Sequence, residues 1–260
     1  MVLWDAITYE VAMPCIELQD LVSHFWCSRW HAGVQRYFTY HATANTRTEI
    51  AFAFAPGSKQ KRNTVFSSIQ GHSNTPRSLE TGDLSEIFGV SLYSHAIPFF
   101  FDLSASALAH QLLDLREVMY TDAGTITDRL ARCFDFRERV GIMTHYLKTR
   151  YNSTRNTDLP VVHAIRQMRK MHGHVTIAGL ARESSLSEKQ FERRFKEFSG
   201  FNPKLYSSIV RFEAALPPHR ERTRFTDKAL ELGYYDQAHF INDFKRYSGF
   251  TPRTFAPVTW

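Results

Sequence analysis

The sequence predicts an α+β protein in which a small antiparallel β-barrel with closing helices precedes an all-α region. Short β-rich runs, separated by glycine, proline and asparagine, fill most of the first part of the chain. After residue 158 the apolar residues fall at helical spacing instead. That second part contains one segment twice, SEKQFERRFKEFSGFNP at 187–203 and DQAHFINDFKRYSGFTP at 236–252. Two copies are too few for a solenoid, so they predict one unit used twice in one domain.

The β-rich part is indicated by four runs, VQRYFTYHAT, TEIAFAFAP, NTVFSSIQGH and LSEIFGVSLYSH. In the second run Phe52 and Phe54 alternate with alanines, which is the period of a half-buried strand. The stretch 127–151 changes to near-helical spacing, as at Leu130, Met143 and Leu147. It predicts one or two helices that close the first domain.

A polar segment divides the chain. YNSTRNTDLP at 151–160 has no apolar period and ends in proline, which is typical of a linker. The predicted domains are therefore residues 1–152 and 159–260. The second carries 17 Lys and Arg against 10 Asp and Glu, whereas residues 1–158 carry 15 against 16. This asymmetry favours a polyanionic partner for the second domain.

The second domain is predicted to be helical throughout. Val161, Ile165 and Met168 lie on one helical face, with Asp158 as a cap and Gly173 at the end. Further helices are expected at 176–182, over the first repeat, at 204–216 and 226–232, and over the second repeat, with a last turn at 251–255. Ser187 and Asp236 are the expected N-caps of the two repeated helices.

The first repeated helix is amphipathic in an unusual way. On a helical wheel Phe191, Phe195 and Phe198 fall within one arc. Lys189, Arg193 and Lys196 fall on the opposite side. The aromatic side is expected to be buried and the cationic side to face outward.

The second copy keeps the inner side as Phe240, Phe244 and Tyr247. Its outer side is formed by Ala238, Asn242 and Lys245, with Arg246 beside them. A short apolar helix and a tight turn precede each copy, as ARESSLS and LELGYYD. This order predicts two helix–turn–helix units whose second helix can enter a major groove of DNA.

The outward side chains suit that task, because Arg reads guanine, Asn reads adenine and Lys attracts phosphate. The predicted DNA-binding residues are Lys189, Gln190, Arg193, Lys196, Gln237, His239, Asn242, Lys245 and Arg246. For Gln190, Gln237 and His239, capping or stabilising the turn is an equal alternative. Glu192 either accepts from cytosine or pairs with a neighbouring Lys or Arg.

The stretches IAGLARESSLSEKQFERRFKEFSGFNP and ALELGYYDQAHFINDFKRYSGFTPRTF resemble the DNA-binding domain of the AraC/XylS family of bacterial transcription regulators. The resemblance covers residues 159–256. It implies two helix–turn–helix units joined by a long helix, binding near promoters and recruitment of RNA polymerase. The stretches ELQDLVSHFWCSRW and LSEIFGVSLYSHAIPFFFDLSASAL are similar to sensing domains found in front of such units. That similarity implies a cupin-like barrel, a small-molecule effector and a homodimer.

The chain departs from the family pattern at several positions. Ser185 stands where glycine is usual in the first turn, and Lys228 where an aliphatic residue is usual. Pro217 and Pro218 shorten the joining helix. Since Asn242 replaces an outward Arg, the first unit is expected to carry more of the specificity.

The first domain offers a candidate effector pocket lined by Trp26, Phe52, Phe54, Tyr93 and Phe99, with an ordinary hydrophobic core as the alternative. Aromatic lining of this kind favours an apolar or planar ligand. The sequence predicts no catalytic residue, metal or cofactor, because it has no GxSxG, P-loop or convincing carboxylate pair. His172 and His174 flank Gly173 and are interpreted as surface residues rather than ligands.

The three cysteines have no zinc-like or disulfide spacing; Cys27 and Cys133 are either oxidant sensors or inert buried thiols. No apolar run spans a membrane and no signal segment is visible, which favours a cytoplasmic protein. The predicted function is DNA-binding transcription regulation modulated by a small molecule. One alternative is a binding or enzymatic barrel with a partner-docking helical domain. Another is a constitutive DNA binder whose barrel only dimerises.

Overall fold

The computed structural model describes residues 7–30, 38–81, 84–151, 158–216 and 232–255. Its strands are β1 (Ile7–Ala12), β2 (Val22–Trp30), β3 (Phe38–Ala42), β4 (Arg47–Ala55), β5 (Asn63–Gln70), β6 (Arg77–Thr81), β7 (Glu86–Tyr93) and β8 (Leu112–Asp114). Its helices are η2 (Ser94–Ala96), α1 (Ile97–Phe100), α2 (Ala105–Leu108), α3 (Leu115–Met119), α4 (Thr121–Arg132), α5 (Phe136–Tyr151), α6 (Leu159–Lys170), α7 (Ile177–Glu183), α8 (Glu188–Ser199), α9 (Pro203–Ala215) and α11 (Gln237–Ser248).

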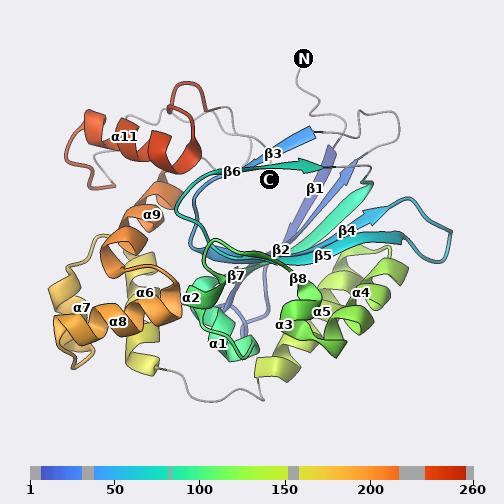
Figure 1. The fold of residues 1–260 in the computed structure, drawn as a ribbon, viewed down its shortest axis with the longest axis horizontal. Coiled ribbons are helices and arrows are strands. Elements are labelled where there is room, and N and C mark those ends of the chain that lie inside the picture. Colours follow the sequence, from blue (N-terminus) through green and yellow to red (C-terminus); the bar gives the residue numbers. More distant parts are fainter. Residues whose placement is uncertain (1–6, 31–37, 82–83, 152–157, 217–231, 256–260) are drawn as a thin grey trace.

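The strands form two antiparallel sheets. The larger sheet has the order β1-β2-β7-β4-β5-β8, and β3 pairs with β6 in a separate ribbon. Figure 1 shows the ribbon on one side of the large sheet and α3–α5 on the other. The α+β class and the N-terminal antiparallel sheet predicted from the sequence are confirmed.

The alternation along β4 decides which side chains lie under the helices. Phe52 pairs with Phe88 across the sheet, and their rings stack with centroids 6.3 Å apart. Phe88 in turn meets the ring of Phe136 on α5 at 6.2 Å. Because successive strand residues face opposite ways, Phe52 and Phe54 belong to the core between the sheet and the helices.

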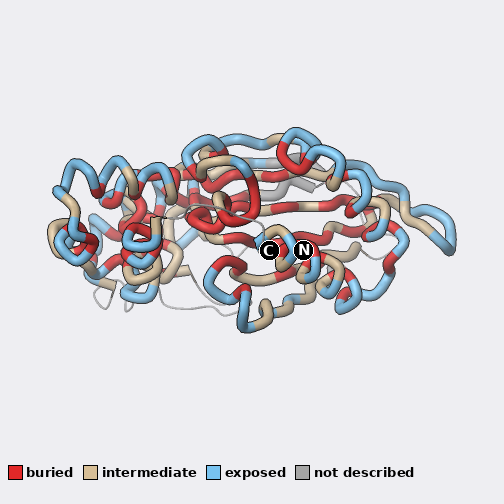
Figure 2. The backbone as a smooth tube through the Cα atoms, turned by 90° about the horizontal axis from the view of Figure 1, so that it is seen from below, coloured by how far each residue is buried: buried red, intermediate tan, exposed pale blue. Residues whose placement is uncertain are grey.

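Two hydrophobic clusters of buried side chains organise the chain. One lies between the large sheet and α1–α5, and the other joins α6–α9 with α11. The clusters interlock, since Ala44 of the β3–β4 connection is buried in the helical cluster and Val162 of α6 in the first. Figure 2 shows buried residues in both parts of the chain, with exposed turns at the margins.

Most predicted elements are present. The four β-rich runs contain β3, β4, β5 and β7, and the stretch 127–151 contains the second half of α4 and all of α5. Strands β1, β6 and β8 are short edge or ribbon strands and gave no sequence signal. The helix expected at 226–232 lies outside the described residues except for Leu232, as do Lys228, Pro217 and Pro218.

The prediction that the Asp158 side chain caps the helix at 159–170 is wrong. Asp158 occupies the N-cap position of α6, but its side chain makes no capping hydrogen bond. Its carboxylate is instead ion-paired with Arg194 of α8. The guanidinium of Arg194 is a charged donor to the Asp158 carboxylate, whereas a capping hydrogen bond would come from a neutral backbone N–H. The ion pair is therefore the stronger of the two interactions.

Candidate nucleic-acid interface

Helix α8 is the first candidate reader, the helix of a helix–turn–helix unit that enters the groove. Ser187 accepts from the backbone N–H of Gln190, and the Gln190 side chain accepts from the N–H of Ser187. This capping box fixes where the helix begins. Phe191 and Phe195 are fully buried, whereas Phe198 is half-buried. The sequence periodicity therefore places the cationic side of α8 in solvent, as predicted.

Helix α11 is the second candidate reader. Asp236 caps it by accepting from the N–H of His239 at 2.7 Å. Phe240 and Phe244 are fully buried, with ring centroids 5.6 Å apart. Both ends of α8 recur in α11 forty-nine residues later, at 188 and 237 and at 199 and 248. The repeated segment thus encodes two helices of the same length, each with a side-chain N-cap and a left-handed glycine C-cap.

Helix α9 joins the two readers and packs on both. Tyr206 meets the ring of Phe195 at 5.4 Å, and Phe212 meets the ring of Phe244 at 5.3 Å. Tyr247 also donates from its hydroxyl to Ser208 at 3.0 Å. With 13 residues, α9 spans roughly 20 Å. Together with the helix diameters this length suits two readers on successive major grooves, which repeat about every 34 Å.

All nine predicted DNA-binding side chains are exposed: Lys189, Gln190, Arg193, Lys196, Gln237, His239, Asn242, Lys245 and Arg246. None of them is covered by the described residues of the two sheets. Gln190 fills the capping role that the sequence left open, and His239 lies 3.5 Å from Asp243, one turn along α11. These two are consequently less available for reading bases than Arg193 and Asn242.

Sequence reasoning missed Tyr235. Its side chain is 90% exposed, directly before the cap of α11. Tyr234 is buried instead and packs against Phe240 with ring centroids 5.1 Å apart. An exposed aromatic at the entry of a reader helix is placed to touch a thymine methyl group or a phosphate. The sequence signal for an exposed aromatic residue was the pair of tyrosines in GYYD, because one of the two rings is buried and the other is exposed.

The turn before α8 also contains a strained residue. Ser185 has a φ of 56°, in the left-handed region that favours glycine. Leu186 donates to the carbonyl of Ala181, and Ser185 donates to that of Arg182. This is the Schellman ending of a helix with serine in the position that glycine usually holds. The turn thus tolerates a left-handed residue at the position where the sequence departs from glycine.

The five aromatic residues predicted to line an effector pocket are not brought together. Phe52 and Phe54 lie in the core under α5, and Phe99 packs against Tyr151. Trp26 lies on the opposite face of the sheet, where its indole N–H donates to Glu49 at 3.1 Å. Of the five, Tyr93 lines the pocket described next, which lies outside this core.

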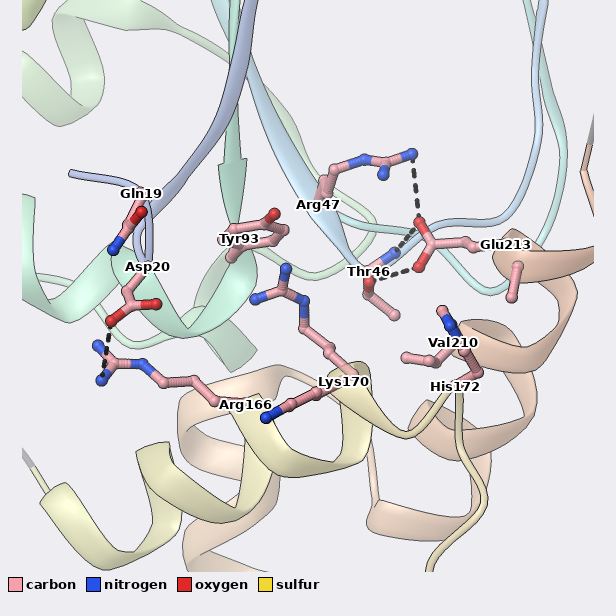
Figure 3. Close-up of a pocket in the computed structure, with 12 residues that line it drawn as sticks. Gln19, Asp20, Thr46, Arg47, Tyr93, Arg166, Lys170, His172, Val210 and Glu213 are labelled. Carbon is pink, nitrogen blue, oxygen red and sulfur yellow. Dashed lines mark hydrogen bonds and ion pairs between the residues drawn. The ribbon is translucent and has the colours of Figure 1, made fainter. Parts of the chain in front are cut away.

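This pocket, of about 450 Å³, lies between the two hydrophobic clusters. Figure 3 shows side chains from β4, the end of β7, α6 and α9 converging on it. Its basic lining consists of Arg47, Arg166, Arg169, Lys170 and His172. Its acidic lining consists of Asp20 and Glu213.

Most of the pocket's charges are held in place. Arg47 pairs with Glu213 at 3.3 Å, and Arg166 pairs with Asp20 at 3.5 Å. The guanidinium carbon of Arg169 lies 3.0 Å from the centre of the Tyr93 ring. Basic side chains therefore outnumber carboxylates in the lining of the pocket.

The cysteines have the environment of inert thiols. Cys27 is fully buried and donates to Glu86 at 3.0 Å, and burial raises the pKa of its thiol. Burial also raises the pKa of Cys133. Both shifts disfavour the reactive thiolate. Among the described residues no three His, Cys, Asp or Glu side chains are placed to hold a metal, and no helix has the length and apolarity that a membrane span requires.

Two family profiles match the chain. A helix-turn-helix domain family matches residues 180–256, and a domain family of unknown function (DUF6597) matches residues 10–114. No curated protein sequence matches.

Among solved structures the chain is similar to ToxT from Vibrio cholerae. The 1.65 Å structure of its P21 form is 13% identical over 95% of this chain and 96% of that chain, with a TM-score of 0.46. ToxT from strain SCE256 bound to an unsaturated fatty acid is 12% identical over 95% and 93%, with a TM-score of 0.45. At these identities and TM-scores the fatty acid bound to ToxT says nothing about the ligand of this chain.

The two capped, outward-charged helices and the match over residues 180–256 define a DNA-binding protein of the helix–turn–helix class. The two helix–turn–helix units, which contain α8 and α11, follow each other along the chain in the order that the repeated segment predicted. Residues 180–256 therefore belong to a helix-turn-helix domain family, and the chain is a DNA-binding regulator by virtue of that domain.

Proposed function

We propose that this regulator reads duplex DNA by placing α8 and α11 in successive major grooves, with Arg193 and Asn242 on base edges and Lys189, Lys196, Lys245 and Arg246 on phosphates. The observation that carries the proposal is the exposure of all these side chains on the outer sides of two equally capped helices. Gln190, Gln237 and His239 stand at the helix entries, where backbone N–H groups also meet phosphates.

Residues 159–260 form the DNA-binding domain in this proposal, and residues 1–152 form the regulatory domain. The separate hydrophobic clusters support this division. In this proposal the regulator acts in the cytoplasm as a homodimer bound to promoters. It contacts RNA polymerase there and performs no catalysis of its own.

The effector site in this proposal is the 450 Å³ pocket lined from both parts of the chain. A small molecule carrying a carboxylate or another anionic group fits its excess of cations. Lys170 and His172 are exposed at the pocket, so the ligand reaches them without disrupting the core. A ligand that contacts both parts favours the arrangement in which both are close.

Two single variants test the DNA interface. The cognate site is first selected from a randomised duplex library with the wild-type protein. Arg193→Ala is expected to lose about 1–3 kcal/mol of binding free energy and to relax preference at one base pair. Lys245→Ala is expected to weaken binding to all sequences alike and to lower the salt-dependence slope by about 1.

Fluorescence anisotropy at several salt concentrations measures both effects. Lys59→Ala is the matched control, because Lys59 is an exposed cation in the β4–β5 loop. Unchanged binding by Arg193→Ala removes its role in base reading. A changed site preference in Lys245→Ala refutes its role as a phosphate contact.

The effector site is tested by thermal shift with a library of small carboxylates. A ligand present at 100 times its Kd stabilises the folded chain by about 2.7 kcal/mol. Lys170→Gln is expected to reduce the thermal shift that the ligand causes. Lys59→Gln is expected to leave that thermal shift unchanged. A shift that persists unchanged in Lys170→Gln and in Arg169→Gln places the ligand elsewhere.

A further inference from the structure

The repeated segment also repeats its ending. Each reader helix ends in Ser-Gly-Phe, at 199–201 and at 248–250, and the glycine of each has a φ of 81°. The hydroxyl of Ser199 donates to the carbonyl of Phe201 at 2.8 Å, and that of Ser248 donates to the carbonyl of Phe250 at 2.9 Å. The two helix–turn–helix units therefore present the same Gly-Phe turn, here called the exit turn.

The N-terminal part of the chain contacts the first exit turn through His72. The imidazole is fully buried and stands edge-on to Phe201, with ring centroids 4.8 Å apart. A Cβ added to Gly200 would lie 1.6 Å from Nε2 of His72. The glycine thus allows the ring to touch the backbone of the reader's end.

The same part of the chain contacts the second exit turn. His41 meets the Phe250 ring edge-on at 5.7 Å, and the side chain of Pro76 lies beside Gly249. The N–H of Ala44 donates to the carbonyl of Tyr247 at 2.7 Å. Ala44 is fully buried in the helical cluster, so this contact is an integral part of the domain core.

The helix between the readers is held as well. Thr46 donates from its hydroxyl to Glu213 of α9 at 2.7 Å and from its backbone N–H at 3.3 Å. The two contacting loops are themselves joined, because Asn45 donates its N–H to the carbonyl of Ser73 at 2.8 Å and the two form a β-bridge. A single bridged structure, residues 41–47 with 72–76, thereby touches both exit turns and α9.

We propose that this bridged structure, here called the splint, positions the two reader helices relative to each other. Residues His72, Pro76 and Ala44 are positioning residues for DNA recognition, since they act through the readers and not on DNA. Two readers reach successive grooves only when their separation and angle match the duplex. The splint fixes that geometry from the N-terminal part, so this part sets which half-site spacing the protein accepts.

The proposal goes beyond the DNA interface and is tested without DNA. Spin labels are attached at Glu192→Cys on α8 and Ala238→Cys on α11, both exposed positions, in a Cys15→Ser background. Electron–electron double resonance then gives the distribution of distances between the readers in the full chain. One narrow distribution is expected when the splint is intact.

Two glycine variants form a matched pair. Gly200→Ala and Gly249→Ala lose the same left-handed glycine, but only the first drives a methyl group into His72; at Gly249 the nearest side-chain atom is 3.5 Å away. Gly200→Ala is expected to shift the distribution or add a second population, and Gly249→Ala to leave it unchanged. An equal change in both variants would overturn the proposal, because backbone strain alone would explain it.

His72→Ala supplies an independent variant should Gly200→Ala fail to fold. Neither ring nitrogen of His72 has a hydrogen-bond partner among the described residues, so the truncation strands no polar group. It is expected to broaden the distribution in a protein whose circular dichroism is that of the wild type. A distribution as narrow as that of the wild type contradicts the positioning role.

Library selection distinguishes this proposal from the DNA-binding one. With an intact splint the selected duplexes are expected to share one half-site spacing, and with His72→Ala several spacings. One spacing shared by both proteins refutes the splint. Enrichment of no duplex by either protein refutes DNA reading, whereas the distance measurement still decides the positioning role.

Discussion

At the scale of single residues, Ser185 adopts a backbone conformation that usually requires glycine. Its φ of 56° lies in the left-handed region, which is unfavourable for serine because of its Cβ and is not unfavourable for glycine. The position is nonetheless required, because the Schellman hydrogen bonds of Ser185 and Leu186 turn the chain from α7 towards α8. The stored strain makes the first unit a site where stability can be gained.

Ser185→Gly is therefore expected to stabilise the protein by about 0.5–1 kcal/mol, the relief of strain being partly offset by the greater entropy of the unfolded chain. Urea unfolding followed by circular dichroism measures the change. Ser184→Gly is the control, because Ser184 has a φ of −80° and gains nothing from glycine. Equal loss of stability in both variants would show that residue 185 carries no strain.

At the scale of elements, a buried ion cluster holds α5 on the large sheet. Glu86 of β7 is 1% exposed and lies 2.8 Å from the fully buried guanidinium of Arg139. Arg62 and Arg29 also pair with this carboxylate, at 2.8 and 3.1 Å. Burial lowers the pKa of Arg139. A guanidinium in this position is tolerated only with its carboxylate present.

Glu86→Gln is expected to destabilise the chain by about 3–5 kcal/mol, because it leaves a buried cation without a counter-charge. Glu10→Gln serves as the control, since Glu10 also pairs with Arg29 but is 38% exposed and is expected to cost at most about 1 kcal/mol. Urea midpoints of the two variants give the comparison. Similar losses for both would mean that burial adds nothing to this cluster.

At the scale of the whole molecule, two buried histidines lie where the N-terminal part meets the helices. Burial, with a smaller contribution from His110, lowers the pKa of His72 to about 3. Burial, followed by Arg169 and Arg166, lowers the pKa of His95 to about 3. His95 remains neutral while donating from Nε2 to the carbonyl of Asp20 at 2.9 Å.

These shifts predict a loss of stability in acid. Between about pH 6.5 and pH 3 the unfolded chain binds a proton at each histidine and the folded chain does not, so stability falls as the pH falls. Each histidine contributes about 1.4 kcal/mol per pH unit in that window. Urea unfolding at several pH values from 7.5 to 5 measures the slope.

His72→Leu is expected to flatten the slope by the contribution of one histidine. His163→Leu is the control, because His163 is exposed on α6. An unchanged slope in His72→Leu would mean that His72 is accessible to protons in the folded chain.

The sequence by itself determined the local structure of the readers. Capping residues, the phenylalanine stripe and the Ser-Gly-Phe ending act within one helix or turn, so Ser187, Asp236, Gly200 and Gly249 specify α8 and α11 without help from distant segments. The period of two in β4 likewise indicated the strand. The outward placement of Arg193 and Lys245 followed from the same periodicity.

Only the tertiary structure decided which segments meet. Alternation says that Phe52 and Trp26 face opposite sides of a sheet once both strands are paired, but the pairing itself is non-local, so the sequence grouped them in one pocket. The pocket of Figure 3 and the splint are built from residues far apart in the chain, such as Thr46 with Glu213 and His72 with Gly200. Such contacts depend on how two cores dock, and no local period records that docking.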